Sequence, residues 1–151
     1  MLNLSKKVLV AIDGSPASDK AAEEAVRMVA ASSNETFRGT LYAVIVRSSK
    51  DPSPLLDQSM APVRHWVKDW DERKKRIFYV VDKAASDAKV QLQKEIIYGE
   101  VDEALLKFAE QHECDVIVIG STGKGLLARA LRGSISNRVS QNARCSVYIV
   151  R

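Results

Sequence analysis

The stretch KVLVAIDGSP, residues 7–16, decides how this chain folds. Its first part is a short apolar run rich in β-branched side chains, which predicts a buried strand over residues 6–12. Asp13 and Gly14 end the run with a turn signal. Ser15 is a good N-cap and Pro16 a good first helical residue. A buried strand that turns at once into a helix is the first unit of an α/β fold.

The rest of the chain repeats this alternation. Apolar residues at a spacing of three to four predict further helices, and short apolar runs predict further strands. We expect helices at residues 16–33, from near 62 to 88, from 101 to near 112 and at about 134–143, and strands at 38–46, 93–99, 114–119 and 145–150. Between them, the proline-rich residues 48–62 read as a long loop, and the charged residues 71–76 predict an exposed or frayed helical turn.

This order predicts a single doubly wound α/β domain with a five-stranded parallel sheet and helices on both faces. Nearly continuous apolar strands are typical of such a sheet. Ligands of doubly wound folds bind beyond the carboxyl ends of the strands, where the chain order reverses. The loops that follow the first and fourth strands, DGS at residues 13–15 and GSTG at 120–123, are therefore expected to face one crevice.

The composition is that of a globular protein, with 46% hydrophobic and 28% charged residues in a chain of 151. One domain of ordinary size accounts for this length. No apolar run approaches the roughly 20 residues that a membrane span needs, and no signal-peptide core is complete before Asp13. We therefore expect a cytoplasmic protein that does not enter a membrane.

The net charge of +4 is concentrated in the last third of the chain, where residues 111–151 hold six basic and two acidic side chains. Basic residues do not alternate with aromatic ones there, as a nucleic-acid surface would require. A pocket for a small anion fits better, and nucleic acid is not expected as a partner. The charged run at residues 71–76 is interpreted as a solvated helix face.

A second stretch, GSTGKGLLARALRGS at residues 120–134, has the chemistry of an anion cradle. Its glycines allow close approach of a ligand to main-chain N–H groups, and Gly133-Ser134 opens a helix whose positive dipole end favours an anion. The P-loop pattern fails because Gly125 is followed by leucine, and the dinucleotide pattern fits weakly because no acidic residue follows. The pattern Gly-x-x-Gly, nine residues, Gly-Ser matches in full from Gly120 to Ser134.

With this pattern the chain resembles the universal stress protein family, in its ATP-binding branch. The blocks VLVAIDGS, GEVDEALLKFAEQHECDVIVIGSTG and RGSISNRVSQNARCSVYIV carry the resemblance over nearly the whole length. It implies a Rossmann-like fold of the adenine nucleotide alpha hydrolase type and a homodimer formed through residues 146–150. The implied cofactor is ATP or another adenine nucleotide, with or without Mg²⁺.

The resemblance also implies a set of binding residues. Gly120, Ser121 and Gly123 would surround the ribose and α-phosphate. The outer phosphates would be held by Gly133, Ser134, Ile135 and Ser136. Asp13 would lie beside the nucleotide and the backbone of Val44 beside the adenine, and Ala11 and Ser15 would complete the site. The chain departs from the family pattern at Thr122 and Ala43, where larger basic or imidazole side chains are common.

Several alternatives remain open at this stage. Asp13 can cap the following helix, contact the ligand, or do both, and it is a weak candidate metal ligand. His65 reads as a surface residue and His112 as a helix end. Cys114 and Cys145 begin what would be adjacent strands and read as buried strand residues, with a thiol pair as the alternative.

The leading functional hypothesis is an ATP-binding, stress-response regulatory protein with slow or no hydrolysis, because phosphoryl transfer needs a placed base and charge neutralisation and no base is evident. A nucleotide-dependent hydrolase completed by Asp51, Asp57 or His65 is one alternative. A nucleotide-independent dimer that binds an unknown protein partner through Trp66 and Trp70 is the other.

Overall fold

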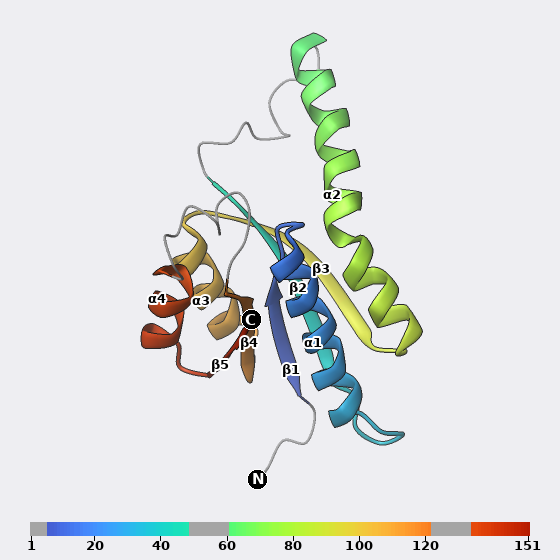
Figure 1. Ribbon diagram of the computed structural model, residues 1–151, viewed down its shortest axis with the longest axis vertical. Helices are drawn as coiled ribbons and strands as arrows, with labels where there is room; N and C mark the ends of the chain where they lie inside the picture. The colour runs from blue at the N-terminus through green and yellow to red at the C-terminus, as the bar shows by residue number, and fades with distance from the viewer. Residues whose placement is uncertain (1–5, 49–60, 122–133) are drawn as a thin grey trace.

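The computed structural model describes residues 6–48, 61–121 and 134–151, and for residues 61–68 it describes the backbone alone. The elements alternate along the chain, as Figure 1 shows. They are β1 (Lys7–Ala11), α1 (Pro16–Ser32), β2 (Thr40–Arg47), α2 (Ala61–Asp87), β3 (Gln91–Tyr98), α3 (Val101–Gln111), β4 (Val116–Gly120), α4 (Ser134–Asn142) and β5 (Ser146–Val150). Each predicted helix and strand is present, with ends shifted by one or two residues.

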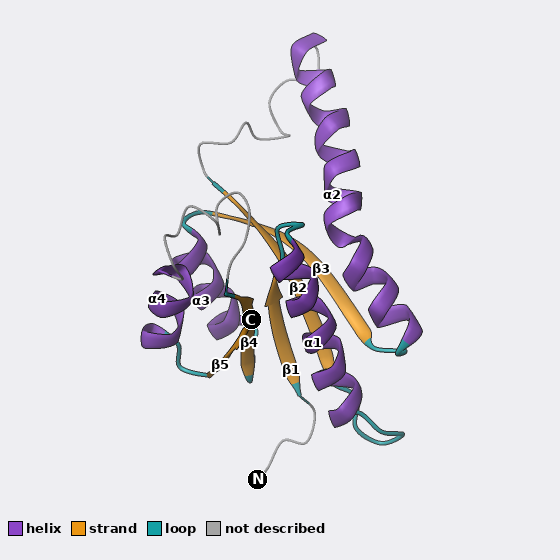
Figure 2. Ribbon diagram, viewed as in Figure 1, coloured by secondary structure: helices purple, strands orange, loops and turns teal. Residues whose placement is uncertain are grey.

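The five strands form one sheet in the order β3-β2-β1-β4-β5, and every pair is parallel. β1 lies at the centre, where Val8 is in register with Leu41 of β2 and with Val116 of β4. The chain therefore winds outward from β1 in one direction and then, from β4, in the other (Figure 2). The point of reversal is between β1 and β4, which confirms the doubly wound prediction.

Each face of the sheet packs into its own apolar cluster. On one face Val8, Val10 and Ile12 pack against α1 and α2, and on the other Leu9 and Ala11 pack against α3 and α4. β1 is buried from both sides, which is why its sequence is apolar at successive positions instead of at alternate ones.

The edge strands differ from the expected continuous apolar pattern. In β3, Gln91, Gln93 and Glu95 are exposed, while Leu92 and Ile96 pack against the α2 side. An edge strand has a neighbour on one side only, so part of its side-chain surface stays in water. β3 therefore alternates between polar and apolar residues more than the central strands do.

Helix α2 continues without interruption through the charged residues 71–76. Most of these side chains are exposed, so the prediction of an exposed turn is confirmed and the frayed alternative is wrong. The following residues Ile77, Phe78, Val81 and Ala85 anchor the helix to the core at a spacing of three to four. In the part of the chain that the structure describes, no helix has the length and apolarity needed to cross a membrane.

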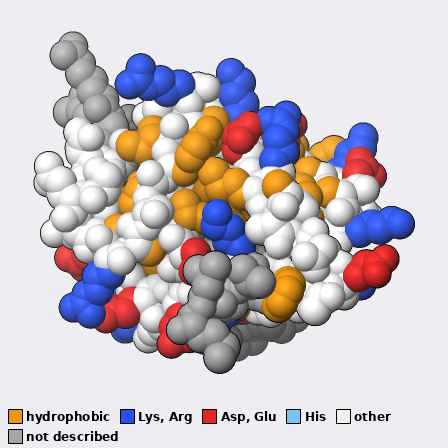
Figure 3. All heavy atoms as spheres, turned by 90° about the horizontal axis from the view of Figure 1, so that it is seen from below, with side chains coloured by type: hydrophobic (Ala, Val, Ile, Leu, Met, Phe, Trp, Pro, Cys, Tyr) orange, Lys and Arg blue, Asp and Glu red, His pale blue; other side chains and the backbone are white. Residues whose placement is uncertain are grey.

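The end of the molecule seen from below in Figure 3 carries both signs of charge. Lysine and arginine side chains stand in several separate places with acidic side chains between them, around a central group of hydrophobic ones. Among the described residues visible on this face, the basic side chains lie apart from one another.

Candidate functional site

Two loops meet at the point where the sheet reverses. Asp13, Gly14 and Ser15 follow β1, while Gly120 ends β4 and Ser121 follows it. The ladder between these strands runs in register from Val8 and Val116, so their carboxyl ends lie at the same edge of the sheet. Ser121 N–H donates to the carbonyl of Val150 at 2.8 Å, which ties this loop to β5 as well. The crevice expected from the sequence would lie at this edge.

Asp13 is held by hydrogen bonds to the turn around it. Its Oδ1 accepts from the N–H of Ser15 at 2.9 Å, and its own N–H donates to Oγ of Ser18 at 3.2 Å. Its second oxygen, Oδ2, is buried and has no hydrogen-bond partner among the described residues. A buried carboxylate oxygen without a donor is costly. Asp13 therefore offers a preset acceptor for a ligand hydroxyl, amine or cation.

Ser15 caps α1. Its Oγ accepts from the N–H of Ser18 at 3.1 Å, and the hydroxyl of Ser18 donates to the carbonyl of Ser15 at 3.2 Å. Both serines are 1% exposed. The predicted N-cap is thus confirmed, and the Ser15 hydroxyl oxygen already accepts a hydrogen bond from the first turn of α1. Asp13 does not cap α1 in the usual way, because its carboxylate accepts from the N-cap residue itself.

Two glycines allow close backbone packing at this edge of the sheet. Gly14 has a φ of +83°, a left-handed conformation that other residues adopt at a cost, and a Cβ there would lie 3.1 Å from Cγ1 of Ile77. At Gly120, a Cβ would lie 2.9 Å from the carbonyl carbon and oxygen of Ala17. Gly120 therefore lets the first turn of α1 pack on the end of β4. Gly14 was not among the predicted site residues, although the Asp-Gly-Ser turn was a signal for it.

The residues beneath this edge of the sheet are apolar. Ala11 and Val44, which are 2% and 0% exposed, share one cluster with the buried Ile135 of α4. The carbonyl of Val44 accepts from the N–H of Ile12 at 2.9 Å, so the ladder already uses it. Ser134 begins α4 and Ser136 is buried in its first turn. Gly123 and Gly133 lie outside the described residues.

Sequence reasoning missed Asp19, in the first turn of α1. Burial raises the pKa of this carboxyl, and the nearby charges of Glu23 and Asp13 raise it further. The spacing of four between Asp19 and Glu23 on one helix was the available signal. Asp13 and Asp19 thus place negative charge beside the crevice. The described residues nevertheless contain no group of three or more His, Cys, Asp or Glu that could hold a metal ion.

The remaining candidates have structural roles. His112 ends α3, stacks on the Phe108 ring at 3.9 Å between centroids and has its Nδ1 3.0 Å from the Phe108 carbonyl. Cys114 and Cys145 are free thiols that lie just before β4 and β5, and burial raises the pKa of Cys114 to about 12. Cys114 is buried as predicted, but Cys145 is only partly buried and neither residue lies within a strand, so the prediction of two buried strand residues is wrong in these respects.

Of the two tryptophans proposed to bind a protein partner, Trp66 and Trp70, the structure describes the side chain of Trp70 only. Trp70 is partly buried against the core, and the Arg47 guanidinium lies 4.0 Å from its ring centroid. This packing weakens the partner-binding hypothesis. The side chains of Trp66 and His65, and the whole of Asp51 and Asp57, lie outside the described residues.

The model of the Universal stress protein family matches residues 5–151. The chain belongs to this family. It is 35% identical over 156 residues to universal stress protein YxiE of Bacillus subtilis, covering 96% of this chain and 98% of that protein. It is 32% identical over 153 residues to a universal stress protein of Methanocaldococcus jannaschii, covering 99% of this chain and 84% of that protein. The family resemblance predicted from the sequence is confirmed.

Solved structures of family members share the fold. Universal stress protein UspA from Lactobacillus plantarum is similar with a TM-score of 0.72 and 26% identity, over 97% of both chains. A universal stress protein in complex with cAMP has a TM-score of 0.63 and 22% identity, over 97% of both. A family protein from Arabidopsis thaliana with AMP bound has a TM-score of 0.65 and 18% identity, over 96% of this chain and 90% of that one.

Proposed function

We propose that this universal stress protein binds an adenine nucleotide, ATP or a related one, in the crevice at the carboxyl ends of β1 and β4. The observation that carries the proposal is the buried, unpartnered Oδ2 of Asp13 at the reversal point of the sheet. Ligands of doubly wound folds bind at that point. The cAMP and AMP complexes of two proteins with the same fold support the choice of ligand.

Different residues would contact different parts of the nucleotide, according to their chemistry. Asp13 would accept a hydrogen bond from a ribose hydroxyl, since its Oδ2 needs a donor. Ala11 and, by its backbone, Val44 would lie beside the adenine. The phosphates would lie toward the β4 loop and the start of α4, where main-chain N–H groups and a helix dipole favour an anion. That part of the site comprises Gly120, Ser121, Gly123, Gly133, Ser134, Ile135 and Ser136.

A metal ion would enter with the nucleotide. Mg²⁺ is commonly bound by one or two carboxylates together with substrate phosphates, and Asp13 is the weak candidate ligand here. Bound Mg²⁺ would neutralise phosphate charge.

The proposed role is that of a cytoplasmic regulatory protein in a stress response, with slow or no hydrolysis. Rapid phosphoryl transfer requires a residue that orients the attacking group and strong charge neutralisation. Near the crevice the described carboxylates are Asp13, whose Oδ1 is committed to the Ser15 amide, and Asp19 on α1.

The first experiment denatures freshly purified protein and identifies any released nucleotide by chromatography and mass spectrometry. Calorimetric titration with ATP, AMP and cAMP then gives the affinities of stripped protein. ATP recovered near one per chain supports the proposal, and recovery of ADP or AMP would favour an enzyme. Protein that releases no nucleotide and binds none at millimolar concentration would overturn the proposal.

The Asp13→Asn variant tests the observation itself. The amide can still accept from Ser15 through its oxygen, but it replaces the Oδ2 acceptor with a donor. A hydrogen bond to a charged group contributes about 1.5–3 kcal/mol, so we expect affinity to fall about tenfold or more. Glu95→Gln, on the exposed side of β3, removes one negative charge elsewhere and should leave affinity unchanged. Equal affinity of both variants would remove Asp13 from the site.

We also propose that two copies associate through β5. This strand forms one edge of the sheet, and Tyr148 and Ile149 on it are 44% and 39% exposed. An edge strand with exposed apolar side chains is suited to pairing with a second chain. Light scattering coupled to size-exclusion chromatography should give the mass of a dimer, and Ile149→Lys should shift it toward the monomer. A monomeric protein at high concentration would contradict this pairing.

A further inference from the structure

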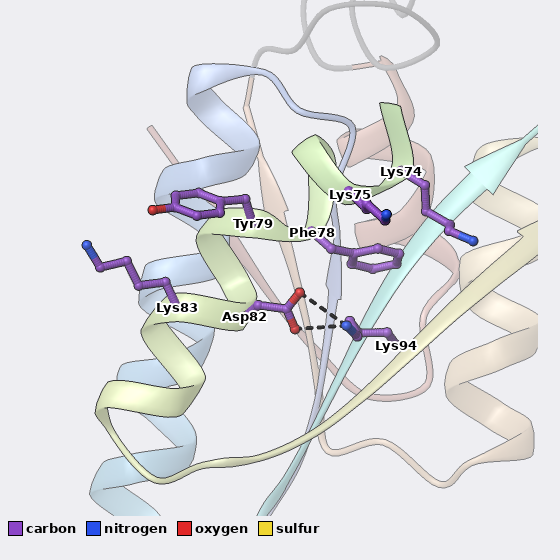
Figure 4. Close-up of a pocket in the computed structure, with 7 residues that line it drawn as sticks. All are labelled: Lys74, Lys75, Phe78, Tyr79, Asp82, Lys83 and Lys94. Atoms are coloured by element: carbon purple, nitrogen blue, oxygen red, sulfur yellow. Dashed lines mark hydrogen bonds and ion pairs between the residues drawn. The ribbon is translucent and has the colours of Figure 1, made fainter. Parts of the chain in front are cut away.

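One hollow away from the proposed nucleotide crevice lies between α2 and β3 (Figure 4). Its carboxylate, that of Asp82, already pairs with Lys94 at 3.0 Å. Lys75 lies on the opposite side of α2 from Tyr79 and Lys83. The described side chains of this hollow therefore do not converge on a single ligand.

A further hollow holds both cysteines of the chain. Its volume is about 240 Å³, and it lies between α3, the end of α4 and the starts of β4 and β5. Cys114 and Cys145 both line it. It is at the amino-terminal edge of the sheet, opposite to the proposed nucleotide crevice. Two thiols that line one cavity can react with each other if the backbone holds them close enough.

The strand ladder sets the distance between these two residues. Val116 is in register with Ser146, and the N–H of Ser146 donates to the carbonyl of Asp115 at 3.3 Å, so Asp115 lies opposite Cys145. Cys114 is therefore displaced by one residue from Cys145. A strand spacing of about 4.8 Å and a rise of about 3.3 Å per residue give a Cα–Cα distance of about 5.8 Å. Disulfides are formed at Cα–Cα distances of roughly 4.4–6.8 Å.

The two side chains lie on the same face of the sheet. In an extended strand, neighbouring positions face opposite sides, so a displacement of one residue would normally separate them. Cys114 departs from this rule because it belongs to the turn that follows α3. Its N–H donates to the carbonyl of Ala109 at 2.9 Å, and Glu113 before it has a φ of +53°. Both cysteines consequently pack against the apolar cluster on the α3 and α4 side of the sheet.

The two thiols differ in access. Cys114 is 7% exposed, while Cys145 is only partly buried. Burial and, second, the nearby Cys145 raise the pKa of Cys114 to about 12. A like charge has such an effect at short range, which agrees with the distance derived from the ladder. Cys145 is thus the thiol that a small oxidant entering the cavity meets first.

We propose that Cys114 and Cys145 form a redox-active pair, which a hydroperoxide converts to an intramolecular disulfide. The Cys145 thiolate attacks one oxygen of hydrogen peroxide, so that the O–O bond breaks and a sulfenic acid forms with release of hydroxide. The Cys114 thiolate then attacks the Cys145 sulfur, the S–O bond breaks and a second hydroxide leaves. The two thiol protons convert these hydroxides to water. Two thiols and one peroxide therefore give one disulfide and two molecules of water.

The bond joins two turns that already touch. It links the turn after α3 to the turn after α4, where Nη1 of Arg144 lies 2.7 Å from Oε1 of Glu110. Cytoplasmic disulfides are usually transient, so we expect the pair to be oxidised only under oxidative conditions. Thiols of high pKa leave slowly from a disulfide. The bond should therefore form slowly and persist until a reductant removes it.

The test compares the thiol–disulfide equilibrium of the folded and the unfolded protein. Intact protein is equilibrated with glutathione buffers of increasing oxidised fraction, with and without urea, quenched in acid and mapped by mass spectrometry without reduction. We expect a peptide link between Cys114 and Cys145. Half-oxidation of the folded protein should need a buffer about tenfold or more less oxidising than in urea, because folding holds the thiols at bonding distance.

Hydrogen peroxide should produce the same link in the folded protein. Folded protein that stays reduced in a buffer that oxidises the unfolded protein would overturn the proposal. Folded protein that forms only mixed disulfides with glutathione, or links between chains, would overturn it as well.

The matched control exchanges two neighbouring residues, Cys145→Ser together with Ser146→Cys, so that the composition is unchanged. Position 146 lies opposite Val116, two residues beyond Cys114, which puts the two Cα atoms about 8 Å apart. That distance exceeds the limit of roughly 7 Å for a disulfide. The exchanged protein should form the link in urea as the unaltered protein does and lose the preference of the folded state. An exchanged protein that forms the link equally well when folded would contradict the proposed geometry.

Discussion

The main chain of Ala17 lies directly over Gly120, at a distance that leaves no room for a side chain. A Cβ at residue 120 would be 2.9 Å from both the carbonyl carbon and the carbonyl oxygen of Ala17. This contact joins the start of α1 to the end of β4, the two elements that border the proposed nucleotide crevice. Gly120 is thus explained by packing before any ligand is considered.

Gly120→Ala should therefore lower stability as well as nucleotide affinity. Overpacking of this kind typically costs about 1–3 kcal/mol, and we expect a loss of that order in urea unfolding. Ala17→Gly should not rescue the variant, because the atoms in conflict belong to the Ala17 backbone. A Gly120→Ala protein with unchanged stability but weaker nucleotide binding would show that ligand contact, and not packing, requires the glycine.

Ser15→Ala should destabilise the protein by about 1 kcal/mol, the usual cost of losing an N-cap. The Oγ of Ser15 is the acceptor for the Ser18 amide, and burial of both residues denies that amide a water replacement. Thermal unfolding followed by circular dichroism measures the loss. Ser15→Asp keeps a capping oxygen but adds charge beside Asp13. A Ser15→Ala protein as stable as the unaltered one would contradict the role of the cap.

Asp19→Asn should raise stability at neutral pH. The pKa of Asp19 is raised by burial and by its acidic neighbours, so the folded state binds a proton more readily than the unfolded state does. The charged carboxylate therefore lowers stability at neutral pH, and this effect disappears as the pH falls below the ordinary value of 3.8. Urea unfolding at several pH values should show a gap between the two proteins that closes in acid. A less stable Asp19→Asn protein at neutral pH would mean that the helix dipole outweighs burial.

Cys114 should react slowly with thiol reagents. Burial, followed by the neighbouring Cys145, raises its pKa to about 12, and the thiolate is the reactive form. At mildly alkaline pH, Ellman's reagent should label Cys114 in a Cys145→Ser protein far more slowly than in the same protein in urea. Cys145, which is less buried, should react sooner in a Cys114→Ser protein. Labelling of folded Cys114 at the unfolded rate would contradict the assignment.

The fold was predictable because its signals are local. The apolar run of β1 predicts a strand within a few residues. The Ser-Pro helix start after it and the periodic apolar residues of α1 and α3 predict helices in the same way. The edge position of β3 was harder to predict. Its polar residues Gln93 and Glu95 mark partial exposure, but only the strand order shows that one side of the strand has no neighbour.

The candidate site was predictable in part. Asp13 and Ser121 could be placed together because parallel strands end at a common edge. The contact between Gly120 and Ala17 could not, since it joins elements about a hundred residues apart and leaves no local pattern. Asp19 was missed because its burial depends on how α1 packs. All the binding roles assigned through the resemblance, those of Gly123 and Gly133 included, remain predictions.

The central position of β1 also affects the order in which the molecule can assemble. β1 is made first, yet one of its two neighbours is β4, and Lys7 N–H donates to Oδ2 of Asp115 across 108 positions of sequence. During synthesis the β1 edge stays open until residues 116–120 leave the ribosome. Contacts so distant in sequence form slowly, and an open apolar edge is prone to aggregate. A nascent chain paused before β4 would therefore expose an unpaired apolar strand edge at the centre of its future sheet.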